Sequence, residues 1–191
     1  GEQYEVGLKY RPTWMDGLFT VSLFDLTRRN VVTGSYGAET QIGAVNSRGI
    51  EFEAKANLTD DLKLTAAVTA YDLEITEDSD ASIVGNTPNI VPQQMASLFV
   101  DYTVPEGRFA GVTLGGGVRY QGESWADNEN TLKVPDATLF DAKLGYERDS
   151  WGLDLNVTNI ADTRYVASCK GQYTCSYGEG RSFKLRAYAK W

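Results

Sequence analysis

The two cysteines are the residues of this chain whose type and spacing most directly suggest chemistry. Cys169 and Cys175 are its only cysteines, and the segment KGQYT separates them. This spacing matches neither the CxxC motif of redox proteins nor the repeated CxxC motif of zinc ribbons. It therefore predicts a short disulfide, of the kind that forms in an oxidising compartment.

The rest of the composition argues against catalysis and nucleic-acid binding. Histidine, the commonest general base and metal ligand, is absent from the 191 residues, so we expect no enzymatic activity. The net charge of −8, from 18 basic and 26 acidic residues, disfavours contact with a phosphate backbone. The acidic run at 76–80 could hold Ca²⁺, but it lacks the spacing of a calcium loop. We expect a solvated loop there and no metal site.

The elements that must position the cysteines are β-strands. Apolar and polar residues alternate with a period of two, which is typical of a strand whose two faces meet different surroundings. The alternation is clearest in the last ten residues, where the apolar positions are Phe183, Leu185, Ala187, Ala189 and Trp191. We recognise nine such runs, at 4–10, 18–27, 50–58, 62–71, 96–104, 112–121, 138–146, 151–158 and 182–191. The fold class is therefore all-β.

The connections between the runs alternate in length, which favours a transmembrane barrel over a soluble sandwich. Short connections at 11–17, 59–61, 105–111 and 147–150 take turns with long ones at 28–45, 74–94, 123–136 and 159–180. Outer-membrane barrels have short turns on the periplasmic side and long loops outside. No stretch approaches 18 consecutive apolar residues, so a transmembrane helix is excluded. Aromatic residues lie where runs meet the short connections, as in an interfacial girdle: Tyr10, Tyr102, Tyr146, Trp151 and Trp191.

The second face of the runs carries charges, which suits the lumen of a barrel. We expect these side chains to pair across neighbouring strands and with a domain inside the barrel, rather than to form a ligand path. The alternative is the solvent face of a soluble β-sandwich, although the many alanines of the apolar face would bury little area in a globular core. The charged positions are Glu51, Glu53, Lys55, Arg119, Asp141, Lys143, Asp154, Lys184, Arg186 and Lys190.

Nine strands do not make a complete single-chain barrel, because such barrels have an even number of strands and no open edge. Either one strand escapes recognition, or residues 1–191 are the C-terminal portion of a larger barrel. We favour the larger barrel. No signal peptide is visible, because the first ten residues already have the pattern of a strand.

Several segments of the chain resemble the C-terminal part of TonB-dependent outer-membrane siderophore receptors of the ferrichrome-receptor type. The resemblance extends over essentially the whole chain, and the closing aromatic residue is typical of the last strand of such barrels. The segments that carry it are QYEVGLKY, LFDLTRRNVV, SRGIEFEAKANLTDDLKLTAAVTAYD, NTPNIVPQQMASLFVDYTV, VPDATLFDAKLGYE, LDLNVTNIADTRYVASC and YGEGRSFKLRAYAKW.

The resemblance implies an antiparallel transmembrane β-barrel of 22 strands, of which this chain would form about nine, with a plug domain and the other strands upstream. It implies a receptor in the outer membrane of a Gram-negative bacterium, in contact with outer-membrane lipid. The receptor would bind a ferric siderophore as its transported ligand and import it with TonB, which contacts an upstream segment. The alternatives are a passive porin or structural barrel, which would lack a plug, and a soluble β-sandwich binding domain.

The resemblance also suggests ligand contacts around the cysteine pair. Receptors of the ferrichrome type carry an aromatic contact just after the first cysteine, whereas this chain has Lys170 there, which could favour an anionic chelate. Tyr173 and Tyr177 are nearby aromatic candidates. The cysteine pair itself is either a structural clamp or, in addition, part of the ligand mouth.

Three further aromatic residues are candidates for contact with a rigid chelate. Tyr71 should point into the lumen near the outer rim, because it lies on the same face of its run as Thr65. Trp125 and Tyr36 lie in two of the long connections. Aromatic rings suit such recognition because they offer a large contact area at a low entropy cost. Loop packing or placement in the girdle is the alternative role for each of the three.

Overall fold

The computed structural model describes residues 1–33, 37 and 39–191 of the chain. Nearly every element is a β-strand, apart from one 3-10 helix, η1 (Ala81–Ile83). The long strands are β1 (Glu2–Tyr10), β2 (Asp16–Thr33), β3 (Thr40–Asn57), β4 (Leu62–Glu77), β5 (Gln94–Thr103), β6 (Val112–Gln121), β9 (Ala137–Arg148), β10 (Trp151–Thr158) and β13 (Ser182–Ala189). The short strands are β7 (Ser124–Trp125), β8 (Lys133–Val134), β11 (Val166–Lys170) and β12 (Thr174–Tyr177).

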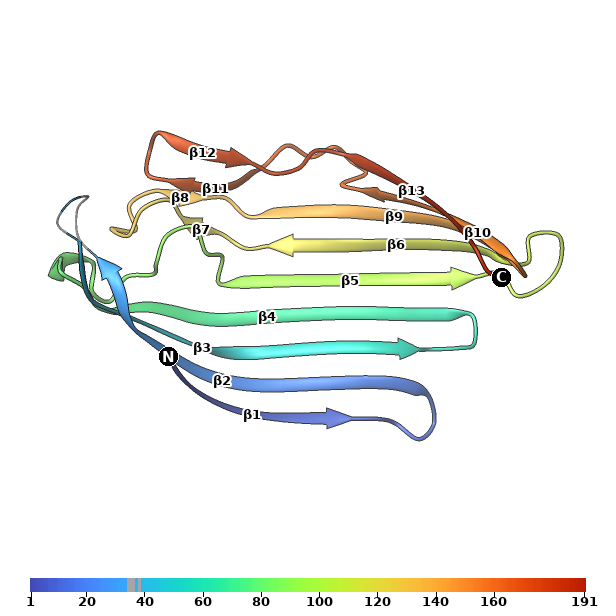
Figure 1. Ribbon diagram of the computed structural model, residues 1–191, viewed down its shortest axis with the longest axis horizontal. Helices are drawn as coiled ribbons and strands as arrows, with labels where there is room; N and C mark the ends of the chain where they lie inside the picture. The colour runs from blue at the N-terminus through green and yellow to red at the C-terminus, as the bar shows by residue number, and fades with distance from the viewer. Residues whose placement is uncertain (34–36, 38) are drawn as a thin grey trace.

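The nine long strands form one antiparallel sheet in the order β1-β2-β3-β4-β5-β6-β9-β10-β13 (Figure 1). Each long strand pairs with the next long strand along the chain, so the sheet is an up-and-down meander. The short strands make two separate hairpins, β7–β8 and β11–β12, which lie beyond the end of the sheet. The predicted all-β class and antiparallel arrangement are confirmed.

Several predicted borders are wrong, because the strands continue beyond the alternating part of the sequence. Residues 28–45 were expected to form a connection, yet β2 runs to Thr33 and β3 begins at Thr40. Likewise, residues 74–77 extend β4. The backbone ladder continues while the alternation stops, because pairing depends on backbone N–H and C=O groups and does not require the two faces to differ in polarity. The long connections at 123–136 and 159–180 also contain strands, since each holds one short hairpin.

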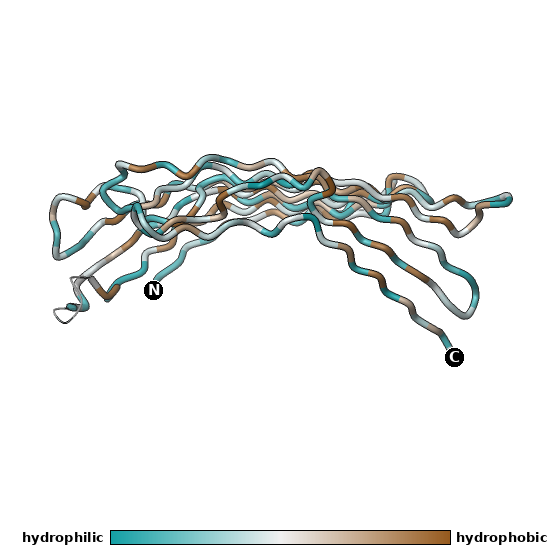
Figure 2. Tube along the Cα trace, turned by 90° about the horizontal axis from the view of Figure 1, so that it is seen from above, coloured by the Kyte–Doolittle hydropathy of each residue, from teal (hydrophilic) through white to brown (hydrophobic). Residues whose placement is uncertain are grey.

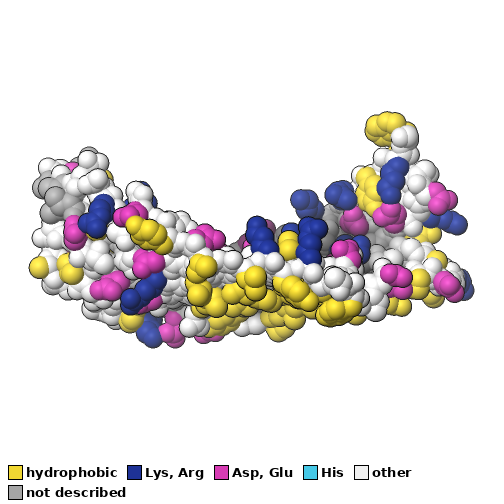
Figure 3. Space-filling view, turned by 90° about the horizontal axis from the view of Figure 1, so that it is seen from below, with side chains coloured by type: hydrophobic (Ala, Val, Ile, Leu, Met, Phe, Trp, Pro, Cys, Tyr) yellow, Lys and Arg dark blue, Asp and Glu magenta, His cyan; other side chains and the backbone are white. Residues whose placement is uncertain are grey.

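The register separates the two predicted faces of the sheet. Phe52 lies opposite Val21 and Val68, and on the other face Glu51 lies opposite Ser22 and Thr69. The sheet is curved, as the tube in Figure 2 shows. Figure 3 shows hydrophobic side chains along the convex side of the curve and Lys and Arg side chains rising from the concave side.

The convex face lacks a covering layer in the described part of the chain. Leu8, Leu114 and Leu185 are 69%, 54% and 71% exposed on it. A soluble sandwich would bury such side chains against a second sheet, because each contributes a few kcal/mol when it leaves water. The architecture therefore does not favour the sandwich alternative. Among the described residues there is no helix long and apolar enough to cross a bilayer.

The short and long connections lie at opposite ends of the sheet, as the sequence predicted. In Figure 1 the short turns are on the right and the long connections, with both small hairpins, are on the left. Aromatic side chains gather near the short turns. The rings of Tyr146 and Trp151 meet edge to face with centroids 5.5 Å apart. The sheet thus has one end built of tight turns and one end built of loops.

One glycine on the concave face makes room for an aromatic ring. A Cβ atom built on Gly117 would lie 2.3 Å from Cδ2 of Phe99, so the ring lies directly on the glycine backbone. Any larger residue at position 117 would force the Phe99 ring away from the wall. The glycine therefore keeps this part of the concave surface flat.

Candidate functional site

Three long connections dock against one another at the loop end of the sheet, and we call residues 78–93, 122–136 and 159–181 the loop cluster. The backbone N–H of Ile90 donates to the carbonyl of Trp125 at 2.7 Å, and the N–H of Gly171 donates to the carbonyl of Ala126 at 2.6 Å. These contacts join segments that are far apart in the sequence. Hydrogen bonds therefore hold the three loops together as one layer, which we call braced, rather than leaving them as independent segments.

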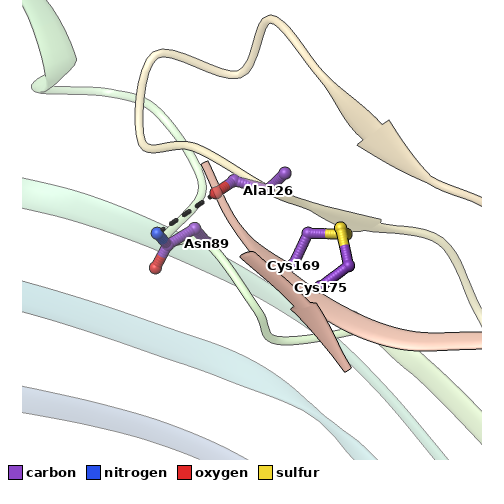
Figure 4. The surroundings of a disulfide bond; sticks show 4 residues. All are labelled: Asn89, Ala126, Cys169 and Cys175. Atoms are coloured by element: carbon purple, nitrogen blue, oxygen red, sulfur yellow. Dashed lines mark hydrogen bonds between the residues drawn. A yellow bond between two sulfur atoms is a disulfide. The ribbon is translucent and has the colours of Figure 1, made fainter. Parts of the chain in front are cut away.

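A small apolar core lies inside the loop cluster. Ala126, Val134 and Cys169 are 0%, 2% and 7% exposed, and Val166 packs against them. Figure 4 shows the disulfide beside Ala126, whose carbonyl also accepts a hydrogen bond from the Asn89 side chain at 3.5 Å. The disulfide hairpin is thus anchored to the loop that contains Trp125.

The predicted disulfide is present and joins Cys169 to Cys175 across the β11–β12 hairpin. The three neighbouring candidates all lie on this hairpin. Lys170 is exposed at the end of β11, Tyr173 is 96% exposed at the turn, and Tyr177 is 80% exposed at the end of β12. Their side chains are therefore free to meet a ligand, and their role in binding stays a prediction.

The side chains of Trp125 and Tyr71 are less free to move, because each already contacts another residue. Nζ of Lys133 lies 5.3 Å from the centroid of the Trp125 ring, and the hydroxyl of Tyr71 donates to the carbonyl of Pro92 at 2.8 Å. Tyr71 lies on the concave face as predicted, since it stands opposite Gly49 and its ring lies 6.5 Å from that of Phe24. Its hydrogen bond ties the first part of the loop cluster to β4. Tyr36 lies outside the described residues.

The predicted pairing of charges across the concave face is confirmed for several residues. Lys143 lies 3.2 Å from Asp101, and Arg186 lies 3.3 Å from Asp154. These pairs lie toward the short-turn end of the sheet. Because they neutralise one another, they leave little net charge on that part of the wall.

A third pair, Arg119 with Asp141, lies nearer the loop end of the sheet. Its carboxylate has a further hydrogen-bond partner. Nε and Nη2 of Arg119 donate to the two carboxylate oxygens of Asp141 at 2.6 and 2.9 Å. Oδ1 of Asp141 also accepts the backbone N–H of Asn159 at 2.9 Å. Asn159 is the first residue after β10, so this carboxylate joins the concave wall to the base of the loop that carries the disulfide.

Asn159 is a structural residue that the sequence pattern did not reveal. It is 1% exposed and has a φ of 50°, which asparagine tolerates better than most residues. Its side chain accepts from the N–H of Thr163 at 2.9 Å and donates to the carbonyls of Thr163 and Glu179 at 2.9 and 3.1 Å. It therefore holds the two ends of the disulfide loop together. The available signal was an asparagine directly after an apolar strand, which is typical of a turn.

A carboxylate inside the loop cluster is stabilised in its charged form. Asp127 accepts hydrogen bonds from the hydroxyl and the backbone N–H of Thr131, at 2.6 and 2.7 Å. The hydroxyl contact is the main reason that the pKa of Asp127 lies below its usual value. Asp80 makes similar contacts with Ser82 in the neighbouring loop, and its pKa is lowered for the same reason.

Comparison with known protein families shows which family has this architecture. The family model described as TonB dependent receptor-like, beta-barrel, matches residues 1–160. The chain belongs to this TonB-dependent receptor family. Proteins of this family are β-barrels of the Gram-negative outer membrane. The chain is 38% identical over 190 residues to the ferrioxamine receptor of Yersinia enterocolitica. The aligned region makes up 95% of this chain and 26% of that protein.

Other TonB-dependent receptors give a similar picture. The ferrichrome outer membrane transporter/phage receptor of Escherichia coli K12 is 39% identical over 95% of this chain and 25% of its own length. The solved siderophore receptor PiuA from Acinetobacter baumannii superposes with a TM-score of 0.81 at 26% identity, over 97% of this chain and 27% of that one. The chain thus spans about a quarter of the length of these relatives.

Because the chain belongs to the TonB-dependent receptor family, the surroundings of each face of the sheet can be assigned. In an outer-membrane barrel the apolar outer face contacts lipid and the polar face lines the lumen. Outward apolar positions run from 62 to 70 on β4 and from 112 to 120 on β6. This span of about 9 residues is the length with which a tilted strand crosses a bilayer. The loop cluster then lies at the outer mouth of the lumen.

Proposed function

We propose that this chain is the C-terminal part of the barrel of an outer-membrane receptor that binds a ferric siderophore and imports it. The observation that carries the proposal is the braced loop cluster over the charged concave face, at the end opposite the tight turns. A chelate that arrives from outside would meet this layer first. The ferrioxamine and ferrichrome receptors among the relatives support the choice of ligand class.

The remaining parts of such a receptor would lie upstream of this chain. We propose that they include the other barrel strands, a plug domain inside the lumen and the segment that contacts TonB. Import would then need energy delivered through TonB, and the chain would have no catalytic role. A passive porin is the alternative, and it would have no plug. Residues 1–191 alone are expected not to transport iron, because the plug would be missing.

Six residues are proposed to contact the chelate at the outer mouth. Aromatic and cationic side chains near the tip of a braced loop can bind a rigid ligand at a low entropy cost. Exposure of Tyr173 and Tyr177 supports their place in this set. The proposed contacts are Tyr36, Tyr71, Trp125, Lys170, Tyr173 and Tyr177.

The test is iron uptake by the full-length receptor in a strain that lacks its own siderophore receptors. Cells are given radioactive iron as ferrichrome or as ferrioxamine B, and uptake is compared with and without a functional TonB. The proposal expects TonB-dependent uptake of at least one ferric chelate from a wider panel. Uptake that persists without TonB would instead support a passive pore. Absence of uptake of every chelate would contradict the proposed function.

A further inference from the structure

A hollow lies on the concave face directly below the loop cluster, between β4, β5, β6 and β9. Its volume is about 250 Å³. Most of its wall is apolar or small, and the residues that shape it are Ala67, Met95, Ala137, Leu139, Arg119 and Tyr165. Tyr165 reaches it from the disulfide loop, whereas the others belong to the sheet. The hollow therefore lies where the barrel wall meets the loops of the outer mouth.

Arg119 lines this hollow and has hydrogen-bond donors that Asp141 does not use. Its guanidinium donates to Asp141 through Nε and Nη2. Nη1 has no hydrogen-bond partner in the part of the chain that the structure describes, and the side chain is 45% exposed. A guanidinium has five N–H donors, so the pair with Asp141 leaves several of them available.

Asp141 fixes the direction in which these donors point. The two-point contact with Arg119 holds the guanidinium plane, and the third contact, from the N–H of Asn159, holds Asp141. A donor that is already held in place loses little entropy when a ligand binds. We therefore regard Asp141 as a positioning residue for Arg119.

The charges around the hollow favour a neutral ligand group. Asp141 balances the charge of Arg119, and Glu179 also acts on the guanidinium electrostatically from the end of the disulfide loop. A carboxylate entering the hollow would meet these two acidic groups, whereas Arg119 is the one cation among the described residues that line it. A carbonyl oxygen can accept from Nη1 without that repulsion.

We propose that this hollow is a ligand subsite that takes an apolar arm of the ferric chelate bearing a neutral carbonyl oxygen, which accepts a hydrogen bond from Nη1 of Arg119. The inference rests on the proposed function, and it adds a contact in the lumen wall to those proposed at the outer mouth. The methylene part of the arm would pack on Met95 and Ala67, and the carbonyl would lie against the guanidinium.

The test is the dissociation constant of the full-length receptor in detergent for ferrichrome and for ferrioxamine B. The first variant is Arg119→Gln, which removes the charged donor, and we expect it to raise Kd about tenfold for the chelate that binds. Arg119→Lys should give an intermediate value, since it keeps a donor without the fixed plane. Arg186→Gln is the matched control, because Arg186 also pairs with an aspartate on the concave face but far from the hollow.

A second pair of variants tests the hollow without touching Arg119. Ala67→Phe would fill the hollow and is expected to raise Kd by a similar factor. Ala66→Phe is its control, since Ala66 is the adjacent residue of β4 and lies on the lipid face. This pair keeps the test decisive if Arg119→Gln prevents folding.

Ferric citrate probes the charge of the preferred arm. We expect it to bind the hollow weakly or not at all, so its Kd should not change in Arg119→Gln. A larger loss for citrate than for ferrichrome and ferrioxamine B would overturn the preference for a carbonyl. Unchanged Kd values for Arg119→Gln and Ala67→Phe, in a receptor that binds one of the chelates, would overturn the subsite alone. A wild-type receptor that binds no ferric chelate would overturn the proposed function, and the subsite with it.

Discussion

The backbone N–H of Asn159 donates a 2.9 Å hydrogen bond to Oδ1 of Asp141. Asn159 begins the disulfide loop and Asp141 belongs to β9, so the contact connects the outer mouth to the lumen wall. The same carboxylate holds Arg119. Hence the position of the loop base and the direction of the guanidinium depend on one side chain.

Replacement of Asn159 by alanine should loosen the disulfide loop. The substitution removes three hydrogen bonds of a side chain that is 1% exposed, and it leaves backbone groups of Thr163 and Glu179 without their partner. We expect a local loss of about 2 to 4 kcal/mol. Hydrogen exchange of residues 159–181 in the full-length receptor would measure it. Asn156→Ala, a change within β10, is the control, and equal protection in both variants would contradict the role assigned to Asn159.

Removal of the disulfide should also weaken the loop, through a different mechanism. The bridge closes a short segment with a sequence separation of 6. In the chain-entropy estimate, a loop of this length is stabilised by about 2 kcal/mol. The double variant Cys169→Ser/Cys175→Ser should therefore be cleaved faster by protease within 166–177, while the barrel stays intact. Cleavage at the wild-type rate would mean that the contacts of Ala126 and Val134 hold the hairpin without the bridge.

Arginine substitutions at two adjacent positions of β4 should distinguish its two faces. Ala66 lies on the convex face opposite Ala54, and Thr65 lies on the concave face opposite Lys55. Ala66→Arg places a cation in the middle of the bilayer and should destabilise the barrel by about 2 to 4 kcal/mol. Thr65→Arg should cost much less, because its side chain enters the lumen. Unfolding by denaturant in lipid vesicles measures both variants, and equal losses would refute the assignment of faces.

Acidification should loosen the loop that contains Asp127. The pKa of Asp127 is lowered mainly by the hydroxyl of Thr131, so the charged form stabilises the folded loop. This stabilisation is fully present above the ordinary carboxyl pKa of about 4 and is lost as the pH falls through the lower folded value. Trp125 is two residues away, and its fluorescence during acid titration should report the change.

Two variants control this pH titration. Thr131→Val removes the hydroxyl donor and should move the transition to higher pH, because the pKa of Asp127 returns toward its usual value. Asp80→Asn removes the other loop carboxylate with a lowered pKa and should leave the transition in place. A titration that responds to Asp80→Asn and not to Thr131→Val would assign the change to the neighbouring loop.

The strands and the faces could be predicted because they depend on a local pattern. A period of two separates residues such as Phe52 and Glu51 onto opposite faces, whatever the rest of the chain does. The same pattern failed at 28–45, where β2 and β3 extend beyond the alternating residues. There apolar residues are adjacent in the sequence, as at Val31 and Val32 and at Ala44 and Val45, so no period of two marks the strands.

The sequence by itself determined the all-β class, the two faces, the sorting of short and long connections, and the disulfide, since each follows from residue type and spacing. Only the tertiary structure decided that Asp141 holds both Arg119 and Asn159, and that Ala126 lies beside Cys169. The reason is that these contacts join segments whose separation along the chain carries no information about their distance in space. They depend on how the register of the sheet and the docking of the loops bring those segments together.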